Sequence, residues 1–260
     1  MSVVIYELEN HVALITLNRP EALNTFNPAM YSEFNAATER FRQDKDAWVA
    51  VIAGAGDKAF SAGLDIKTLD NAFNESGGNL DSVNEVFDVE LQGEYFSDKP
   101  IIAAIQGFCI GEGLSTALAC DLRIATESAI FALPESKIGV PTINASIHGA
   151  RIMGTANALE LLLMGEQRDA KWAYRTGLVN LVVAEDELLD IALDWARKIA
   201  GVAPLANRVT KEAVVRSQYR TFTEVVEIAR HRREEMANGP DGLEGRRAFI
   251  EKRKPRFIGE

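Results

Sequence analysis

The sequence predicts an α/β fold, in which a core of alternating strands and helices is followed by a helical C-terminal region. Three observations support this prediction. Short apolar runs of strand length alternate with helix-like segments in the first half of the chain. Two of these runs end in glycine-containing turns that open helices. From Asn157 onward the pattern is mostly helical, as expected for α/β cores with helical appendages.

The N-terminal segment should form two strands and a helix. Residues 3–10 and 11–20 read as short strands joined around Glu9 and Asn10. A helix is expected over 27–44, because Asn27 suits the capping position and the next residue is a proline.

The middle of the chain should alternate buried strands with helices. The apolar run at 48–56 ends in glycines, which is typical of a strand buried on both faces. Residues 71–81 resemble a mobile surface loop, and a helix is expected from there to about Ser97. A second buried strand should cover 99–111. The remaining expected elements are a short helix at 113–121 and strands at 122–127 and 178–183.

Composition limits the class of protein. The 260 residues suit either one large domain or one domain with a helical appendage. We divide the chain into a core at 1–195 and a helical region at 196–260. The formal net charge of -10 disfavours non-specific binding to nucleic acid or to an anionic membrane. We therefore expect neither as a partner.

The two cysteines indicate a reducing compartment. Cys109 and Cys120 both lie in apolar company, and two cysteines cannot form a disulfide framework. The first ten residues show neither a signal peptide nor a membrane span. The cytoplasm is the expected location.

A local excess of positive charge stands out near the C-terminus. Residues 246–256 hold six basic residues and one acid, Glu251. This segment could bind an anionic ligand, or it could be a solvated helix face. The basic residues are Arg246, Arg247, Lys252, Arg253, Lys254 and Arg256.

Two glycine turns and one carboxylate are candidates for a common site. The turns at 58–67 and 107–116 each place small residues between a buried strand and a helix. Helix N-termini present free backbone N–H groups, and two that converge would form an oxyanion hole. Glu135 follows Pro134 in an apolar stretch, where a carboxylate is either a cap or a base with a raised pKa.

Six segments, in order along nearly the whole chain, resemble the crotonase family, the enoyl-CoA hydratase/isomerase superfamily. They are "ITLNRPEALNTF", "AFSAGLDIK", "KPIIAAIQGFCIGEGLSTALACDLRIA", "FALPESKIGVP", "GLVNLVV" and "AFIEKRKPRF". The resemblance implies a spiral of repeated strand-strand-helix units with a helical C-terminal trimerisation region. It also implies trimers or hexamers, an acyl-CoA substrate, and no metal or redox cofactor.

The resemblance also assigns residues to the thioester. It implies that the backbone N–H groups of Leu64 and Glu112 hold the thioester carbonyl and stabilise an enolate. It implies that CoA lies along one set of N-terminal positions, with Lys67 beside the phosphates, and that two C-terminal residues close over it from a neighbouring subunit. The CoA positions are Arg19, Ala22, Leu23, Ala62, Asp65, Ile66, Phe249 and Lys252.

The acid–base residues depart from the family pattern. Hydratases of this family carry two glutamates, which correspond to Ser115 and Glu135 here. A serine cannot accept a proton from water at neutral pH. Relatives with only the second glutamate include Δ3-Δ2-enoyl-CoA isomerases, so hydration and isomerisation both stay open, as do other acyl-CoA reactions such as decarboxylation and C–C cleavage.

Glu112 has two interpretations. Positions 112 and 115 form an i, i+3 pair if a helix starts near 112, so the Glu112 carboxylate could replace the missing acid–base group. Alternatively, Glu112 is a solvent-facing glutamate at a helix N-terminus, and only its N–H takes part. A negative charge beside an oxyanion hole would oppose enolate formation unless the carboxyl is protonated.

Three polar residues follow Glu135 where the family commonly has small ones: Asn144, Ser146 and His148. His148 is either structural or a second acid–base group. Two other classes of function are weaker. An RNA-binding relative conflicts with the net charge, and a serine hydrolase using Ser61 or Ser115 lacks the expected sequence around either serine.

Overall fold

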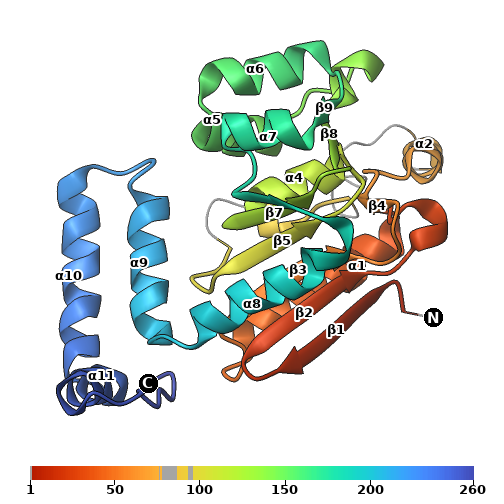
Figure 1. Cartoon of the computed structure of the whole chain (residues 1–260). Helices are drawn as coiled ribbons and strands as arrows, with labels where there is room; N and C mark the ends of the chain where they lie inside the picture. Colours follow the sequence, from red (N-terminus) through yellow and green to blue (C-terminus); the bar gives the residue numbers. More distant parts are fainter. Residues whose placement is uncertain (1, 76, 78–86, 93–95) are drawn as a thin grey trace.

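The computed structural model describes residues 2–75, 77, 87–92 and 96–260, and a six-stranded sheet forms its centre (Figure 1). The strand order is β1-β2-β3-β5-β7-β10. The first two strands pair antiparallel and the others pair parallel. The expected N-terminal strands are confirmed. The strands are β1 (Val4–Glu9), β2 (Val12–Leu17), β3 (Val49–Gly54), β5 (Ile101–Ile105), β7 (Leu122–Thr126) and β10 (Leu181–Val183).

A helix covers each face of this sheet. On β3, Val49 and Val51 pack with Ala192 and Ala196 of helix α8 (Leu188–Ala200). The alternate residues of β3 face the main core, which α1 (Pro28–Gln43) also joins. This alternation follows from the two-residue period of a strand, and it explains why the strand is apolar throughout.

The N-terminus of α1 forms as expected. Asn27 caps it, since the side-chain oxygen accepts a hydrogen bond of 2.9 Å from the Met30 N–H, and Pro28 is the first helical residue. The aromatic side chains of Phe34 and Phe41 project from α1 into the core and are fully buried.

A second, four-stranded sheet carries the glycine turns. Its order is β4-β6-β8-β9, and the first three strands are parallel neighbours. The carboxyl ends of parallel neighbours meet at one edge, where binding sites of α/β proteins commonly form. Both glycine turns and Glu135 follow strands of this set. The strands are β4 (Ala59–Ser61), β6 (Phe108–Ile110), β8 (Ile130–Ala132) and β9 (Arg168–Asp169).

Further helices and 3-10 turns complete the core. Helix α4 (Glu112–Ala119) begins directly after the second glycine turn and packs against α5 (Asn144–Met153). The other helices and 3-10 turns here are η1 (Pro20–Ala22), η3 (Pro134–Ile138), α6 (Thr155–Met164), α7 (Ala170–Thr176) and η4 (Glu185–Glu187).

The segment expected as a loop and then a helix is different in the structure. Residues 71–75 belong to helix α2 (Ile66–Glu75), so the prediction of a loop from 71 is wrong there. The expected helix up to Ser97 is also wrong for the described residues 87–92 and 96–97. They contain a 3-10 turn, η2 (Glu90–Gln92), but no α-helix, and Ser97 has no regular secondary structure. The rest of both predictions lies outside the described residues.

The C-terminal helices extend away from the core. Figure 1 shows α9 (Pro204–Arg216) and α10 (Phe222–Asn238) as an antiparallel pair beyond α8, with α11 (Pro240–Glu251) at the far end. The expected boundary between the core and the helical region, at 195/196, falls inside α8 and not at an end of a helix. The division into these two parts stays a prediction. Within the described parts of the chain, we find no helix with the length and apolarity needed to span a membrane.

Candidate active site

The two glycine turns meet at the carboxyl edge of the second sheet. Gly63 follows β4 and has a φ of +98°, and a Cβ atom there would lie 2.8 Å from the Ile110 carbonyl oxygen and 3.4 Å from the Glu112 nitrogen. No side chain fits in that space, and the positive φ disfavours any residue except glycine. The sequence thus brings the backbones at 63–64 and 111–112 into contact.

Each turn has a free backbone N–H group that faces the other turn region, that of Leu64 in the first and that of Glu112 in the second. The neighbouring groups are engaged, since the Asp65 N–H donates to Phe26 O and the Gly111 N–H donates to Ala132 O, both at 2.9 Å. Within the described part of the chain, neither the Leu64 N–H nor the Glu112 N–H donates a hydrogen bond. Two such donors side by side can bind an oxygen atom that becomes negatively charged.

Ser61 fixes the position of the second turn. A Cβ atom on Gly113 would lie 2.4 Å from Ser61 O, so α4 packs directly on β4. The Ser61 hydroxyl is fully buried and donates to Asn24 O at 2.8 Å, while it accepts from the Gly63 N–H at 3.2 Å. These bonds give Ser61 a structural role and leave the serine hydrolase interpretation without an available nucleophile at this position.

Glu135 faces the second turn. It lies in η3 directly after β8, and a Cβ atom on Gly111 would be only 3.3 Å from Glu135 Oε1. Glu135 Oε2 is buried and has no hydrogen-bond partner among the residues described. Burial raises the pKa of Glu135, although the Thr142 hydroxyl and the residue's own backbone N–H oppose the shift. This environment suits a group that exchanges protons near neutral pH.

The Glu112 side chain is only partly exposed, and it is directed toward the buried Gln92 rather than into open solvent, which does not fit the solvent-facing interpretation. Burial raises the pKa of the Glu112 carboxyl to about 7, and the nearby Glu135 charge adds to the shift. The Gln92 side-chain amide donates a hydrogen bond to Glu112 Oε1, which opposes it. The structure therefore brings two carboxyl groups with raised pKa values to one pair of free N–H groups.

Ser115 lies one turn further along α4. It is buried, and its N–H donates to Gly111 O at 2.9 Å. Its hydroxyl has no hydrogen-bond partner in the described segments, and no hydrogen bond joins it to Glu112. Gln92 Nε2, which donates to Glu112, also donates to the Thr116 hydroxyl at 3.5 Å.

Most of the residues expected along CoA lie together. The Ala62 N–H donates to Leu23 O at 2.9 Å, and Arg19 Nη2 is 3.5 Å from the Asp65 carboxylate. Arg19 also donates to Thr25 O at 2.6 Å. These contacts join the segment after β2 to the segment after β4. The expected set in this region is Arg19, Ala22, Leu23, Ala62, Asp65 and Ile66.

Phe249 and Lys252 do not reach this region within one chain. Both lie at the end of α11, which Figure 1 places far from β4 and α2. Phe249 is 86% exposed, which is unusual for an aromatic side chain without a partner.

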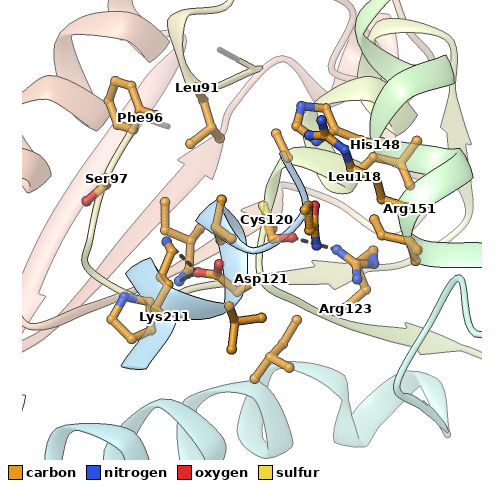
Figure 2. A pocket seen from close by; sticks show the side chains of 18 of the residues that line it. Leu91, Phe96, Ser97, Leu118, Cys120, Asp121, Arg123, His148, Arg151 and Lys211 are labelled. Atoms are coloured by element: carbon orange, nitrogen blue, oxygen red, sulfur yellow. Dashed lines mark hydrogen bonds and ion pairs between the residues drawn. The ribbon is translucent and has the colours of Figure 1, made fainter. Parts of the chain in front are cut away.

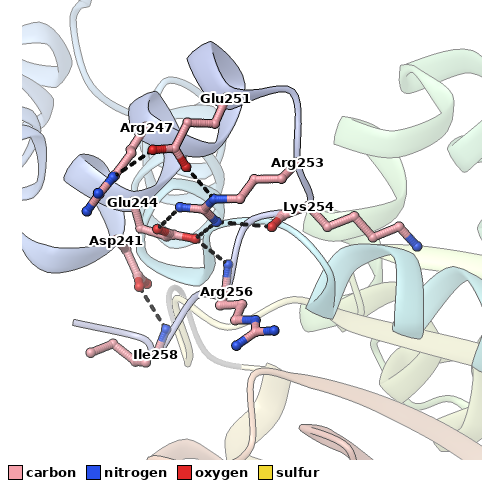
Figure 3. Close-up of polar contacts among 8 residues, drawn as sticks. All are labelled: Asp241, Glu244, Arg247, Glu251, Arg253, Lys254, Arg256 and Ile258. Carbon is pink, nitrogen blue, oxygen red and sulfur yellow. Dashed lines mark hydrogen bonds and ion pairs between the residues drawn. The ribbon is translucent and has the colours of Figure 1, made fainter.

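The C-terminal basic segment is partly neutralised by acids (Figure 3). Arg253 forms ion pairs with Glu244 at 2.6 Å and with Glu251 at 2.7 Å, and Arg247 also pairs with Glu251. Arg253 lowers the pKa of the Glu244 carboxyl to about 2. The sequence window of 246–256 missed Glu244. Lys252, Lys254 and Arg256 form no ion pair with any described residue.

One cavity lies apart from this site, at the other end of α4. It holds about 440 Å³, and Leu118 and Cys120 at the C-terminal end of α4 line it, whereas Glu112 is at the N-terminal end (Figure 2). An ion pair between Lys211 of α9 and Asp121 closes one side, at 2.8 Å. His148 lines the cavity, while neither Leu64 nor Glu135 does.

One residue of the site, Gln92, was not identified from the sequence. Gln92 is buried between α4 and α5, and contacts Glu112, Asn144 and His148. It lies in a stretch with weak periodicity and no motif, so no local signal could have identified it. His148 Nε2 lies 3.1 Å from Gln92 O, which gives the histidine a structural partner.

Comparisons with known proteins agree with this geometry. A family model described as enoyl-CoA hydratase/isomerase matches residues 7–260. A probable enoyl-CoA hydratase of Rhizobium meliloti is 40% identical, with 98% of this chain and 97% of the relative covered. An (E)-benzylidenesuccinyl-CoA hydratase of Thauera aromatica is 37% identical, with 98% and 99% covered.

Solved structures show the same fold. The crystal structure of an enoyl-CoA hydratase from Bacillus anthracis superimposes with a TM-score of 0.90 at 31% identity, covering 99% of this chain and all of the other. An enoyl-CoA hydratase/carnithine racemase from Magnetospirillum magneticum gives a TM-score of 0.89 at 34% identity, with 100% and 97% covered. The predicted α/β fold class is confirmed.

Proposed function

The chain belongs to the enoyl-CoA hydratase/isomerase family, and from this premise we propose that it adds water reversibly to a 2-enoyl-CoA, using Glu135 and Glu112 as its two acid–base groups. One observation carries the proposal: two partly buried carboxyls with raised pKa values lie beside two free backbone N–H groups. Proton-transfer groups work best when their pKa values lie near the working pH.

The free N–H groups have a defined role in this reaction. The thioester oxygen gains negative charge when the enolate forms, and the N–H groups of Leu64 and Glu112 would stabilise that charge. Removal of one such donor typically costs about 3 kcal/mol of transition-state stabilisation. Since only the backbone of residue 112 is needed for this role, its side chain is free to take a second one.

The two carboxyls would share one proton. Before hydration Glu135 is protonated and Glu112 is ionised. Water then forms a bond to C3 while it gives its proton to Glu112, and C2 takes the proton of Glu135. Afterwards Glu112 is protonated and Glu135 is ionised, so the charge of the pair is unchanged. Interacting carboxyls that share a proton titrate as a pair, and the charge of Glu135 does raise the pKa of Glu112.

Isomerisation of a 3-enoyl-CoA is the second candidate. It is favoured by Ser115, which occupies the position of the first family glutamate, and by the buried, unpartnered Glu135 Oε2. In that reaction Glu135 alone would remove a proton from C2 and return it at C4. The two candidates differ in whether Glu112 is required.

The proposal extends to the surroundings of the site. CoA would lie along the segments after β2 and β4, with Arg19, Lys67 and Lys252 near its phosphates. The exposed Phe249 supports closure over the CoA of a neighbouring subunit in a homotrimer or a dimer of trimers.

The chemistry requires no metal or redox cofactor. The buried free thiols of Cys109 and Cys120 support a reducing compartment such as the cytoplasm.

The decisive experiment follows the ultraviolet absorbance of crotonyl-CoA, which falls as the conjugated enoyl thioester is hydrated. We expect rapid loss with the wild-type protein and strongly reduced loss with E112Q and with E135Q. No loss with a wild-type protein that binds CoA would contradict hydration. A 3-enoyl-CoA should then be tested, and turnover that survives E112Q but not E135Q would establish the isomerase.

A further inference from the structure

We propose that Gln92 is a positioning residue that holds the Glu112 carboxylate for proton transfer, and that Asn144 and His148 of α5 hold Gln92 in turn. The inference rests on the proposed function to the extent that Glu112 exchanges a proton with water. It starts from the contacts of Gln92, which is buried on η2 between α4 and α5 with 6% of its surface exposed.

The side-chain amide of Gln92 has a defined orientation. Its nitrogen donates to Glu112 Oε1, and its oxygen accepts a hydrogen bond of 3.3 Å from Asn144 Nδ2. An amide group carries two donors on one side and an acceptor on the other. In the reversed orientation the Gln92 side-chain oxygen would face the Glu112 carboxylate, and the Gln92 nitrogen would face the Asn144 nitrogen. Neither pair could form a hydrogen bond. Asn144 therefore fixes the donor side of Gln92 toward Glu112.

The backbone of Gln92 is held as well. His148 Nε2 lies 3.1 Å from Gln92 O, and the Gln92 N–H donates to Val89 O at 2.9 Å. Asn144 and His148 are four residues apart on α5, so they lie on the same helix face. Residues on one face of α5 thus contact both the side chain and the main chain of Gln92.

Gln92 also opposes the groups that raise the pKa of Glu112. Among the described residues, the charged groups that raise the pKa of this carboxyl are Glu135 of η3 and Asp88 before η2. Tyr31 of α1 also faces Glu112, and His148 of α5 contacts the Gln92 carbonyl. In the described segments no Lys or Arg forms an ion pair with Glu112. The hydrogen bond from the Gln92 amide lowers the pKa of Glu112 and so favours the ionised form, which is the form able to accept a proton from water.

The contact makes Gln92 different from a residue that only supports the fold. If its amide is lost, the Glu112 carboxylate loses both its direction and its donor. A misplaced catalytic group costs rate even where the fold survives, by up to about a hundredfold for a displacement near 1 Å. The pKa of Glu112 should also rise, because the hydrogen bond that lowers it is gone.

The test compares Q92L with the control Q106L. Gln106 donates to Gly54 O at 2.7 Å and to Gly56 O at 3.1 Å, outside the site, so its loss is a structural change of a similar kind. We expect Q92L to lower kcat for crotonyl-CoA about tenfold to a hundredfold. We also expect it to move the acidic limb of the pH profile of kcat/KM upward. Q106L should lower the thermal midpoint and leave the profile in place.

Two further measurements keep the result decisive. N144L removes the donor to the Gln92 oxygen without adding a charge near Glu112, and it should reproduce part of the Q92L shift, even if Q92L folds poorly. Difference infrared spectroscopy, with E112Q as the reference, follows the ionisation of Glu112 without any substrate. If wild-type protein fails to hydrate crotonyl-CoA, the proposed function is wrong, but a Glu112 titration shifted upward in Q92L still supports the contact. An unshifted titration in Q92L and N144L would overturn the positioning role.

Discussion

The backbone at Gly111 lies directly against the carboxylate of Glu135. A Cβ atom on Gly111 would be 3.3 Å from Glu135 Oε1 and 3.8 Å from Gly63 Cα. The φ of Gly111 is +54°, which residues with a side chain rarely adopt. This glycine therefore serves the turn, the contact with the other turn and the position of Glu135 at once.

G111A should reduce activity more than stability. The added methyl group pushes on Glu135, and the unfavourable backbone costs about 1–3 kcal/mol. We expect kcat to fall about a hundredfold, as for a displaced catalytic group, and circular dichroism should still show a folded protein at room temperature. G139A is a matched control, since Gly139 has a φ of +75° but its Cβ would meet nothing within 4 Å. Equal losses of kcat in both variants would contradict the role of this contact.

E135Q should abolish turnover and leave CoA binding nearly intact. General acid–base groups typically contribute about 10²–10⁴-fold to the rate. Glutamine keeps the size of the side chain but cannot transfer the proton. Inhibition by free CoA, or calorimetric titration with CoA, measures the retained binding. Joint loss of binding and turnover would instead indicate a folding defect.

E112Q should stabilise the protein at alkaline pH. Folding raises the pKa of Glu112 from an ordinary 4.5 to about 7, so between these values the folded state keeps a proton that the unfolded state has released. Stability therefore falls as pH rises through this window, by at most about 3 kcal/mol in total. We expect E112Q to raise the denaturation midpoint at about pH 8 and to have little effect at about pH 4.

The control for this pH dependence is E187Q, at an exposed glutamate. Denaturant titration at both pH values, with the two variants and the wild type, separates a local effect from a change in net charge. A gain in E187Q equal to that in E112Q would show that the net charge is responsible.

S115E should restore hydration to an E112Q protein. In the double variant, a carboxylate returns to the position that the family glutamate occupies, one helical turn from residue 112. We expect recovery of at least about tenfold in kcat, because an acid–base group is again within reach of the water. Crotonyl-CoA kinetics of E112Q, S115E and the double variant provide the measurement. No recovery, in a folded double variant, would mean that the two positions are not equivalent.

R19A should weaken binding without slowing the chemical step. Arg19 is partly buried beside Asp65, in the segment expected to follow CoA. Loss of one charged contact to a phosphate should raise KM about tenfold with kcat nearly unchanged. R42A is the control, because Arg42 pairs only with Glu39 on the exposed face of α1 among the described contacts. A fall in kcat with constant KM would place Arg19 in the reaction rather than in binding.

The sequence by itself determined the local elements and the type of site. Alternating apolar runs specified the strands at the N-terminus, and Asn27 with Pro28 specified the start of α1, because these signals act over a few residues. The glycines at 63 and 111 marked the two turns, and the six motifs identified the family. These features depend on neighbours in the chain, so the chain alone carries them.

Only the tertiary structure decided how these parts act together. The parallel pairing of β4, β6 and β8 brings Leu64, Glu112 and Glu135 to one edge, and no local pattern encodes strand order. The burial of the Glu112 carboxyl and the role of Gln92 depend on η2 and α5, which are distant from residue 112 in sequence. The extent of α2 was missed as well, because its residues also suit a polar loop. Burial and pairing are properties of surroundings, and the surroundings exist only after folding.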